Sequence, residues 1–250
     1  MPESPDVVLL RSADEPDRYL AAFRENDMRA VCEPVLTFAF PNQEQLASHL
    51  EGVDRYAALV ATSPRVGTAL DRLFADQEDL AARWRGAPAF AVGPKTAERV
   101  QEVGLVTRGA DAGDAAALAE QIAAAVPSGP LLFLCGNRRR DTLPNRLREA
   151  GLAFDELVVY ETRTRRDLTL PSSQEPPGSP WLVFFSPSGL EAVEQAPSVD
   201  PEQLRDTRIA AIGPTTGSAL EKAGWTVEAV AAEPSPDALV EAICDAEPVS

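Results

Sequence analysis

The segment Leu59–Leu70, LVATSPRVGTAL, returns in altered form at Leu182–Val193 as LVFFSPSGLEAV. In each copy an apolar run of strand length ends at Ser-Pro, and an amphipathic helical pattern follows. Serine suits the N-cap of a helix, and proline suits the first helical position because its missing N–H has no partner there. Each copy therefore predicts a buried strand that passes directly into a helix, as in α/β folds.

The rest of the chain repeats at a similar offset of about 120 to 124 residues. The other paired segments are Val7–Phe38 with Leu131–Thr162, Ala91–Val100 with Ala211–Leu220, and Gly113–Ile122 with Pro234–Ile243. About ten strands are expected, near residues 7–10, 30–36, 57–61, 89–92, 104–107, 131–134, 154–160, 181–185, 208–212 and 226–230. That number suits two five-stranded parallel sheets better than one sheet.

Two extended, proline-containing stretches, at about residues 36–41 and 161–180, are predicted to be linkers. A simple duplication would place one boundary near residue 130. Each linker instead follows the second strand of its half, so the domain boundaries are displaced relative to the repeat.

Composition excludes several function classes. The formal charge of −16, with Lys95 and Lys222 as the only lysines, argues against nucleic-acid binding. No apolar run approaches the ~20 residues of a membrane helix, and the N-terminus lacks a signal-peptide pattern. We therefore expect a cytoplasmic protein with no membrane partner.

The cysteines and the single histidine, His49, are too few and too scattered for the commonest catalytic centres. Cys32, Cys135 and Cys244 form neither a CxxC pair nor a disulfide framework. A metal site or a histidine-based triad usually needs more such residues. GxGxxG and Walker A sequences do not occur, so no cofactor and no metal are expected.

Four strand ends carry Ser-Pro or Gly-Pro, and we term these pairs helix openings. They are Ser63-Pro64, Gly93-Pro94, Ser186-Pro187 and Gly213-Pro214. In parallel sheets they lie at the carboxyl ends of strands, where open α/β folds bind ligands. Helix N-termini offer unpaired N–H groups and partial positive charge to anions, although ordinary capping is the alternative. Hydroxyls that could add donors are Thr62, Ser63, Thr96, Ser186, Ser188, Thr215 and Thr216.

Other candidate residues also follow strands. Arg138 comes after Leu131–Leu134, and Arg11 follows the first strand at the repeat position equivalent to Cys135; either arginine could pair with a carboxylate or simply be solvated. Arg139 and Arg140 are interpreted as solvated, and Cys135 as a packed residue. Tyr160 ends a strand, where its hydroxyl could transfer a proton or its ring could merely pack.

Several of these segments, in this order and spacing, resemble the uroporphyrinogen-III synthase family, over roughly Val7 to Ile243. They are Thr62–Arg65, Val92–Pro94, Cys135–Asn137, Val159–Thr162, Phe184–Gly189 and Ala210–Thr216. The resemblance implies two flavodoxin-like α/β domains, each with a parallel sheet, joined by a two-stranded linker and separated by a substrate cleft. It places residues 1–37 and 168–250 in one discontinuous domain and residues 40–161 in the other.

The resemblance further implies a cofactor-free lyase of heme biosynthesis. We expect a monomer, because motion about a cleft within one chain would suffice and the sequence shows no obvious apolar interface. Its substrate would be hydroxymethylbilane, a linear tetrapyrrole with eight carboxylates, closed to uroporphyrinogen III with inversion of ring D and loss of water. Tyr160 matches the family tyrosine proposed to assist departure of the hydroxyl. The expected substrate-binding residues are Arg11, Thr62, Ser63, Gly93, Thr96, Asn137, Arg138, Ser186, Ser188, Thr215 and Thr216.

Two rival interpretations remain. A hinge-closing receptor for an anionic ligand fits the missing metal and cofactor signals. It predicts an export signal or a partner surface, and neither is visible. A cofactor-using enzyme such as a methyltransferase should have a glycine-rich loop after the first strand, but VVLLRSADEP contains no glycine.

Overall fold

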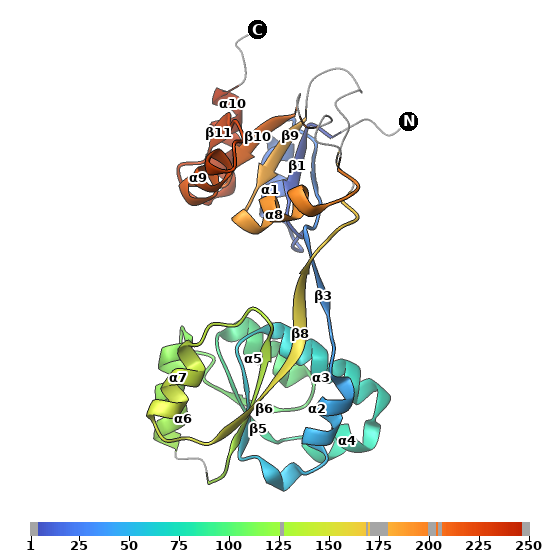
Figure 1. Ribbon diagram of the computed structural model, residues 1–250, viewed down its shortest axis with the longest axis vertical. Coiled ribbons are helices and arrows are strands. Elements are labelled where there is room, and N and C mark those ends of the chain that lie inside the picture. Colours follow the sequence, from blue (N-terminus) through green and yellow to red (C-terminus); the bar gives the residue numbers. More distant parts are fainter. Residues whose placement is uncertain are drawn as a thin grey trace. The chain divides into compact units, whose positions relative to one another are not determined.

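The computed structural model describes residues 5–125, 128–168, 170, 180–199, 204 and 207–246. The chain folds into two compact units. Unit 1 comprises Met1–Thr37 and Arg163–Ser250, and unit 2 comprises Phe38–Thr162. Figure 1 shows the elements of both units.

Unit 1 contains a parallel sheet with the strand order β11-β10-β9-β1-β2. The strands are β1 (Val7–Leu10), β2 (Ala30–Cys32), β9 (Trp181–Phe184), β10 (Arg208–Ala211) and β11 (Ala229–Val230). The helices are α1 (Arg18–Glu25), α8 (Pro187–Gln195), α9 (Pro214–Lys222) and α10 (Pro236–Asp245). Taken in chain order, the strands lie 2-1-3-4-5, which is the flavodoxin-like arrangement.

Helices cover both faces of this sheet, and its neighbouring strands β1 and β9 are apolar and buried along their whole length. Along β1, Val7 and Leu9 pack with α1 and α10, whereas Val8 and Leu10 pack with α8 and α9. The alternation follows from the period of two in a strand. A sheet buried on both faces is what the continuous apolar runs of the sequence predict.

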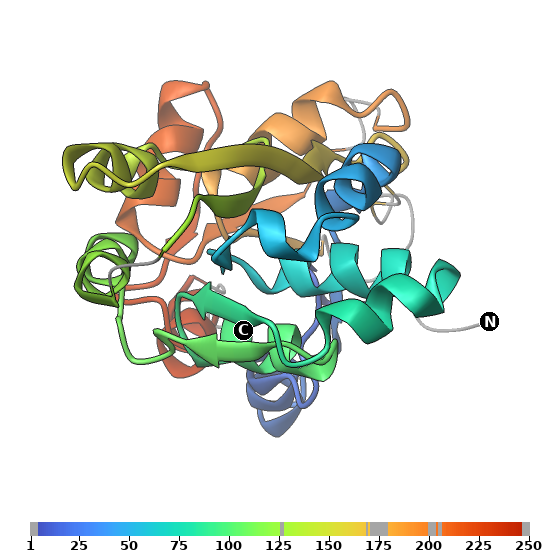
Figure 2. The ribbon, with the colours of Figure 1, turned by 90° about the horizontal axis from the view of Figure 1, so that it is seen from below.

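Unit 2 contains a six-stranded sheet with the order β3-β8-β7-β4-β5-β6. The strands are β3 (Leu36–Ala39), β4 (Ala58–Ala61), β5 (Pro88–Ala91), β6 (Val106–Arg108), β7 (Leu131–Gly136) and β8 (Phe154–Thr164). The helices are α2 (Gln43–Leu50), the 3-10 helix η1 (Val53–Arg55), α3 (Pro64–Asp76), α4 (Glu78–Trp84), α5 (Pro94–Glu102), α6 (Ala115–Ala125) and α7 (Thr142–Glu149). Residues of α2 to α5 form the core on one face, and residues of α6 and α7 form it on the other. Figure 2 shows α6 and α7, in green and yellow-green, lying together.

The two sheets share one topology. When unit 2 is counted from β7, the order β8-β7-β4-β5-β6 is again 2-1-3-4-5. The strands β7, β8, β4, β5 and β6 thus correspond to β1, β2, β9, β10 and β11, which is the pairing that the sequence repeat predicts. The predicted α/β class with two flavodoxin-like parallel sheets is confirmed.

The expectation of two five-stranded sheets is wrong for unit 2. The strand predicted over residues 30–36 ends at Cys32, and Leu36–Ala39 of the predicted first linker forms β3 beside β8. A proline at position 34 separates the two pieces. The second predicted linker begins within β8, and its residues 169 and 171–179 lie outside the described residues. No helix in the described ranges is long and apolar enough to cross a membrane.

Candidate active site

Tyr160 of β8 lies across the end of the neighbouring parallel strand β7. The register shifts after Cys135, so that Gly136 pairs with Tyr160 where an unbroken register would give Val159. Such a β-bulge re-aims the side chain beside it. A Cβ built on Gly136 would lie 2.3, 2.5 and 2.7 Å from Cζ, Cε2 and the hydroxyl oxygen of Tyr160. Glycine at position 136 therefore makes room for the half-buried tyrosine ring.

Asn137 fixes the two strands beyond the bulge. Its backbone N–H donates to the Tyr160 carbonyl at 3.2 Å. Its side chain accepts from the Thr162 N–H at 2.9 Å and donates to the Thr162 carbonyl at 3.4 Å. The side chain thereby extends the ladder between the strands. Because its amide is already bonded to β8, Asn137 is placed to hold Tyr160 rather than to contact a substrate.

The helix openings of unit 2 use their polar groups differently. Ser63 caps α3, and its hydroxyl accepts from the Arg65 N–H at 3.3 Å. Gly93 caps α5 with a φ of 76°, in the left-handed region that favours glycine, and no atom lies within 4 Å of a Cβ placed there. Thr62 is half-buried, whereas Thr96 is only 4% exposed. The helix opening at Gly93 is therefore more accessible than the one at Ser63.

The helix openings of unit 1 leave more hydroxyl groups accessible. Ser186 precedes α8 and, in the described residues, makes no capping bond; its Oγ lies 2.7 Å from Oγ of Ser188. Thr215 is exposed in the first turn of α9, whereas Thr216 is 4% exposed. Gly213 has extended backbone with a φ of 173°, and the space beside it is empty to 4 Å. Ser186, Ser188 and Thr215 are thus the best-placed hydroxyl donors of this unit.

Arg11 is held by its own loop. Its guanidinium pairs with Asp14 at 2.6 Å and with Asp17 at 2.7 Å, and its side chain is 15% exposed. It also lies over the rings of Tyr19 and Phe185, 5.2 and 5.3 Å from their centroids. Two carboxylates therefore already compensate the charge of Arg11. The geometry does not support the expected contact with a substrate carboxylate, because such a contact would have to displace these partners.

The three consecutive arginines after β7 are not equivalent. Arg138 is exposed and, within the described part of the chain, pairs with no carboxylate, so it can bind an anion. Arg139 pairs with Glu156 and Asp141, which raise the pKa of its guanidinium further above its usual value. The interpretation of Arg139 as a solvated side chain is therefore wrong: it ties the loop to β8.

Cys135 is a packed residue, as interpreted from the sequence. Its side chain is fully buried, and the Sγ–H group lies 3.5 Å from Oε1 of Glu156. Burial, followed by the charge of Glu156, raises the pKa of the Cys135 thiol to about 12. A thiol this weakly acidic supplies almost no thiolate nucleophile at neutral pH.

Comparison with known proteins identifies the family. A family model described as uroporphyrinogen-III synthase HemD matches residues 17–241. The chain belongs to the uroporphyrinogen-III synthase family. It is 31% identical over 250 residues to the uroporphyrinogen-III synthase of Schizosaccharomyces pombe, covering 95% of each chain. It is 33% identical over 172 residues to that of Saccharomyces cerevisiae, covering 62% of each.

A solved structure shows the same fold. The uroporphyrinogen-III synthetase of Helicobacter pylori 26695 superposes with a TM-score of 0.60 at 20% identity. The match covers 98% of this chain and 100% of that one. Because the two sequences are only 20% identical, this similarity supports a shared fold and nothing further.

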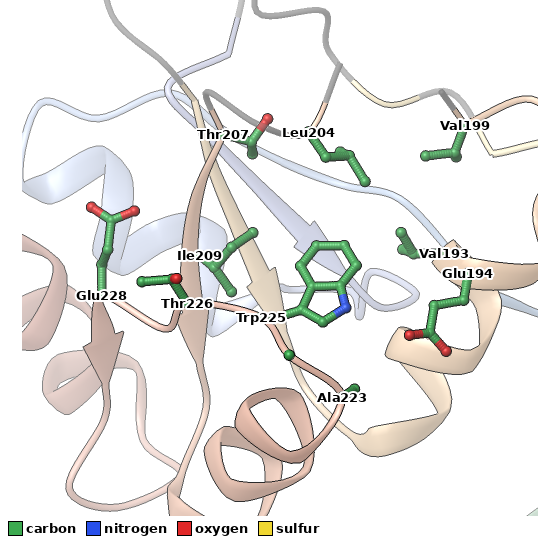
Figure 3. A pocket seen from close by; sticks show the side chains of 11 residues that line it. Val193, Glu194, Val199, Leu204, Thr207, Ile209, Ala223, Trp225, Thr226 and Glu228 are labelled. Carbon is green, nitrogen blue, oxygen red and sulfur yellow. The ribbon is translucent and has the colours of Figure 1, made fainter. Parts of the chain in front are cut away.

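A cavity of about 730 Å³ in unit 1 does not suit the substrate of a uroporphyrinogen-III synthase. Its lining residues are Val193, Glu194, Val199, Leu204, Thr207, Ile209, Ala223, Gly224, Trp225, Thr226 and Glu228. Figure 3 shows the Trp225 indole at its centre, between Ile209 and Val193. It lies at the amino end of β10, on the opposite edge of the sheet from the starts of α8 and α9. Among the described residues its lining includes two glutamates but neither lysine nor arginine, which disfavours a polycarboxylate.

Sequence reasoning missed Arg65, the second residue of α3. Its guanidinium carbon lies 3.6 Å from the centroid of the Phe38 ring, and its side chain is half-buried. Burial lowers the pKa of Arg65, while the charge of a Tyr160 phenolate would act in the opposite direction. One signal was visible: a cation in the first turn opposes the helix dipole, and the repeat has Ser188 at the equivalent place.

Proposed function

We propose that this chain converts hydroxymethylbilane to uroporphyrinogen III, closing the ring with inversion of ring D and loss of water. It is a lyase of heme biosynthesis. The observation that carries the proposal is 31% identity to the S. pombe synthase over 95% of both chains. The Tyr160–Gly136 pair and the helix openings supply groups that suit this chemistry.

Tyr160 assists departure of the hydroxyl group. Its O–H donates a proton to the hydroxymethyl oxygen as the C–O bond breaks, and the bonding electrons leave with water. The pyrrole nitrogen supplies the electron pair for the new exocyclic double bond. The phenolate then removes the pyrrole N–H proton, which gives a neutral azafulvene and restores Tyr160. This is general acid–base catalysis by a single hydroxyl group.

The later steps depend on geometry more than on further acid or base groups. The substituted carbon of ring D attacks the azafulvene and forms a spiro intermediate, which fragments and closes with ring D reversed. Without enzyme, hydroxymethylbilane closes to the uninverted type I isomer. The protein must therefore hold the two ends of the bilane so that the inverted closure is faster.

The substrate carboxylates bind where strands end. In unit 1 the donors are the Ser186–Ser188 pair and Thr215, and in unit 2 they are the Gly93 opening and Arg138. A helix N-terminus contributes about 0.3–1 kcal/mol to a bound anion, so several are needed to fix a flexible ligand.

The remaining predicted binding residues act mainly by shaping these sites. Ser63 caps α3, and Thr96 and Thr216 are buried in first turns. Asn137 and Arg11 are bonded to their own units, and Thr62 borders the Ser63 opening.

We further propose that the enzyme acts as a cytoplasmic monomer without metal or cofactor. The charge of −16 favours a soluble, mutually repelling population of molecules. Full activity in EDTA and a single sedimenting species of monomer mass are the expected results. Loss of activity on chelation, or a dimer at assay concentration, would contradict this part of the proposal.

The test of function is turnover of fresh hydroxymethylbilane by the purified protein in buffer containing EDTA. The product is oxidised, and the porphyrin isomers are separated. We expect mainly type III, whereas the control without protein gives type I. Type I alone from a folded sample would contradict the proposal.

A further inference from the structure

Arg65 is a half-buried cation without an ion-pair partner among the described residues. This is unexpected in a chain with 39 aspartates and glutamates. Arg99, on the neighbouring helix α5, is paired with both Asp71 and Glu102. Removing a charge from water without a partner is unfavourable, so the setting of Arg65 requires a physical explanation.

The fold holds Arg65 in place despite this cost. The guanidinium carbon lies 3.6 Å from the centroid of the Phe38 ring, a favourable cation–π contact. Phe38 belongs to β3, which neighbours β8, the strand of Tyr160. The side chain also extends from the first turn of α3, where the helix dipole repels a cation. The helix dipole disfavours an arginine here, and no ion pair within the described residues stabilises one. We therefore infer that Arg65 interacts with a negative charge that is present only during turnover.

Tyr160 packs against the core to which Val66 and Ala69 of α3 belong, so it lies on the face of the sheet that carries the helix of Arg65. In keeping with this placement, the charge of a Tyr160 phenolate would raise the pKa of Arg65. While Tyr160 is protonated there is no such anion. We propose that Arg65 is a positioning residue that stabilises the Tyr160 phenolate while its proton resides on the departing water. The proposal rests on the acid role of Tyr160 given above. That proton leaves in the water molecule, and the phenolate takes a different proton from the pyrrole N–H, which restores the Tyr160 hydroxyl.

A competing role is possible for the same side chain, namely a permanent contact with a substrate carboxylate. The two roles differ in what they change. Stabilisation of the phenolate acts only in the step that creates it, so it affects kcat and depends on the Tyr160 hydroxyl. A carboxylate contact made in substrate and transition state alike affects KM and is independent of that hydroxyl.

Arg72 offers a matched control. It lies two turns further along α3, and its guanidinium carbon is 4.4 Å from the centroid of the Phe40 ring, but its side chain is exposed. Arg65→Met and Arg72→Met each remove one guanidinium group from α3, together with its cation–π contact to one aromatic ring. Arg65→Lys restores a cation without the planar group.

The experiment is a double-mutant cycle on kcat and KM, with folding checked by circular dichroism and thermal unfolding. We expect Arg65→Met to lower kcat about 10- to 100-fold with KM changed less than about twofold. Arg65→Lys should recover part of the loss, and Arg72→Met should match wild type. In a Tyr160→Phe background, Arg65→Met should cost less than about twofold more.

An equal loss in both backgrounds, or an effect on KM alone, would overturn the proposal in favour of the carboxylate contact. If Arg65→Met does not fold, Arg65→Gln enters the same cycle with the same two outcomes. The proposed function is tested separately, by whether the wild-type protein forms the type III isomer. A Tyr160→Phe variant with normal kcat would overturn this inference while leaving that function standing.

Discussion

The ring of Tyr160 occupies the space that a side chain at position 136 would need. A Cβ there would lie 2.3 Å from Cζ and 2.7 Å from the hydroxyl oxygen of Tyr160. Gly136 is needed for its small size rather than for a left-handed backbone, because its φ is not positive. The bulge that brings the two residues opposite each other thus depends on glycine at the end of β7.

Gly136→Ala should displace the Tyr160 ring. The clash is with a packed ring, so we expect a loss of about 1–3 kcal/mol in the free energy of unfolding. Displacement of the hydroxyl by about 1 Å should also lower kcat by about 10- to 100-fold. Urea unfolding and initial rates measure the two effects. Gly52→Ala is the control, since its Cβ would meet only Arg55 Cβ at 3.5 Å; equal effects of both variants would contradict this account.

The accessible hydroxyls of unit 1 should contribute to binding and not to the chemical step. We expect Thr215→Ala, and the double change Ser186→Ala with Ser188→Ala, each to raise KM about two- to fivefold with kcat nearly unchanged. Ser218→Ala, an exposed position later in α9, should leave both constants unchanged. A fall in kcat without a rise in KM would assign these hydroxyls to the reaction itself.

Arg11 and Arg138 should separate into a structural and a binding residue. Arg11→Met leaves Asp17, whose side chain is 4% exposed, without its cation, so the free energy of unfolding should fall by about 1–3 kcal/mol. Arg138→Met should leave stability unchanged and raise KM, because the side chain is exposed and unpaired among the described residues. Denaturant unfolding beside steady-state kinetics tests both; the reverse pattern would contradict the assignment.

Asp155 should contribute an acid-sensitive part of stability. The Tyr56 hydroxyl donates to Oδ2 of Asp155 at 2.6 Å and lies 2.6 Å from Nδ1 of His49. That hydrogen bond, helped by Arg55, holds the pKa of Asp155 below its ordinary value of 3.8. Because the folded pKa is lowered, the stabilisation is present above pH 3.8 and disappears as the pH falls through the folded value.

The variant Tyr56→Phe removes this hydrogen bond and should reduce the free energy of unfolding by about 1–2 kcal/mol near pH 6. The difference from wild type should shrink as the pH is lowered from 5 towards 2. Urea unfolding at several pH values measures it. A difference that stays constant over this range would show that Asp155 does not respond to Tyr56.

The strand–helix units were predictable because their signals are local. An apolar run followed by Ser-Pro or Gly-Pro specifies a buried strand, a cap and a first helical residue, and the helices do begin at Pro64, Pro94, Pro187 and Pro214. The sixth strand of unit 2 was not predictable in this way. Leu36–Ala39 is short and only partly buried, and its pairing beside β8 depends on residues more than a hundred positions away.

The candidate site was predictable as a set of positions but not as a set of roles. Sequence placed Arg11 and Arg138 at equivalent strand ends, yet only packing reveals that Asp14 and Asp17 pair with Arg11. The contact between Tyr160 and Gly136 depends on a register shift that no local pattern encodes. Arg65 was overlooked because helix propensity alone does not distinguish an exposed arginine from a half-buried one.

The central claim is that the Tyr160 hydroxyl assists the loss of water in a ring-inverting synthase. Tyr160→Phe keeps the ring on Gly136 and removes only the hydroxyl, so its steady-state kinetics on hydroxymethylbilane test the claim most directly. We predict that kcat falls about 10- to 100-fold, while KM stays unchanged and the type III product is retained. This loss is at or below the usual range for a general acid–base residue, because hydroxymethylbilane already loses water readily without a catalyst. A variant with wild-type kcat would contradict the claim.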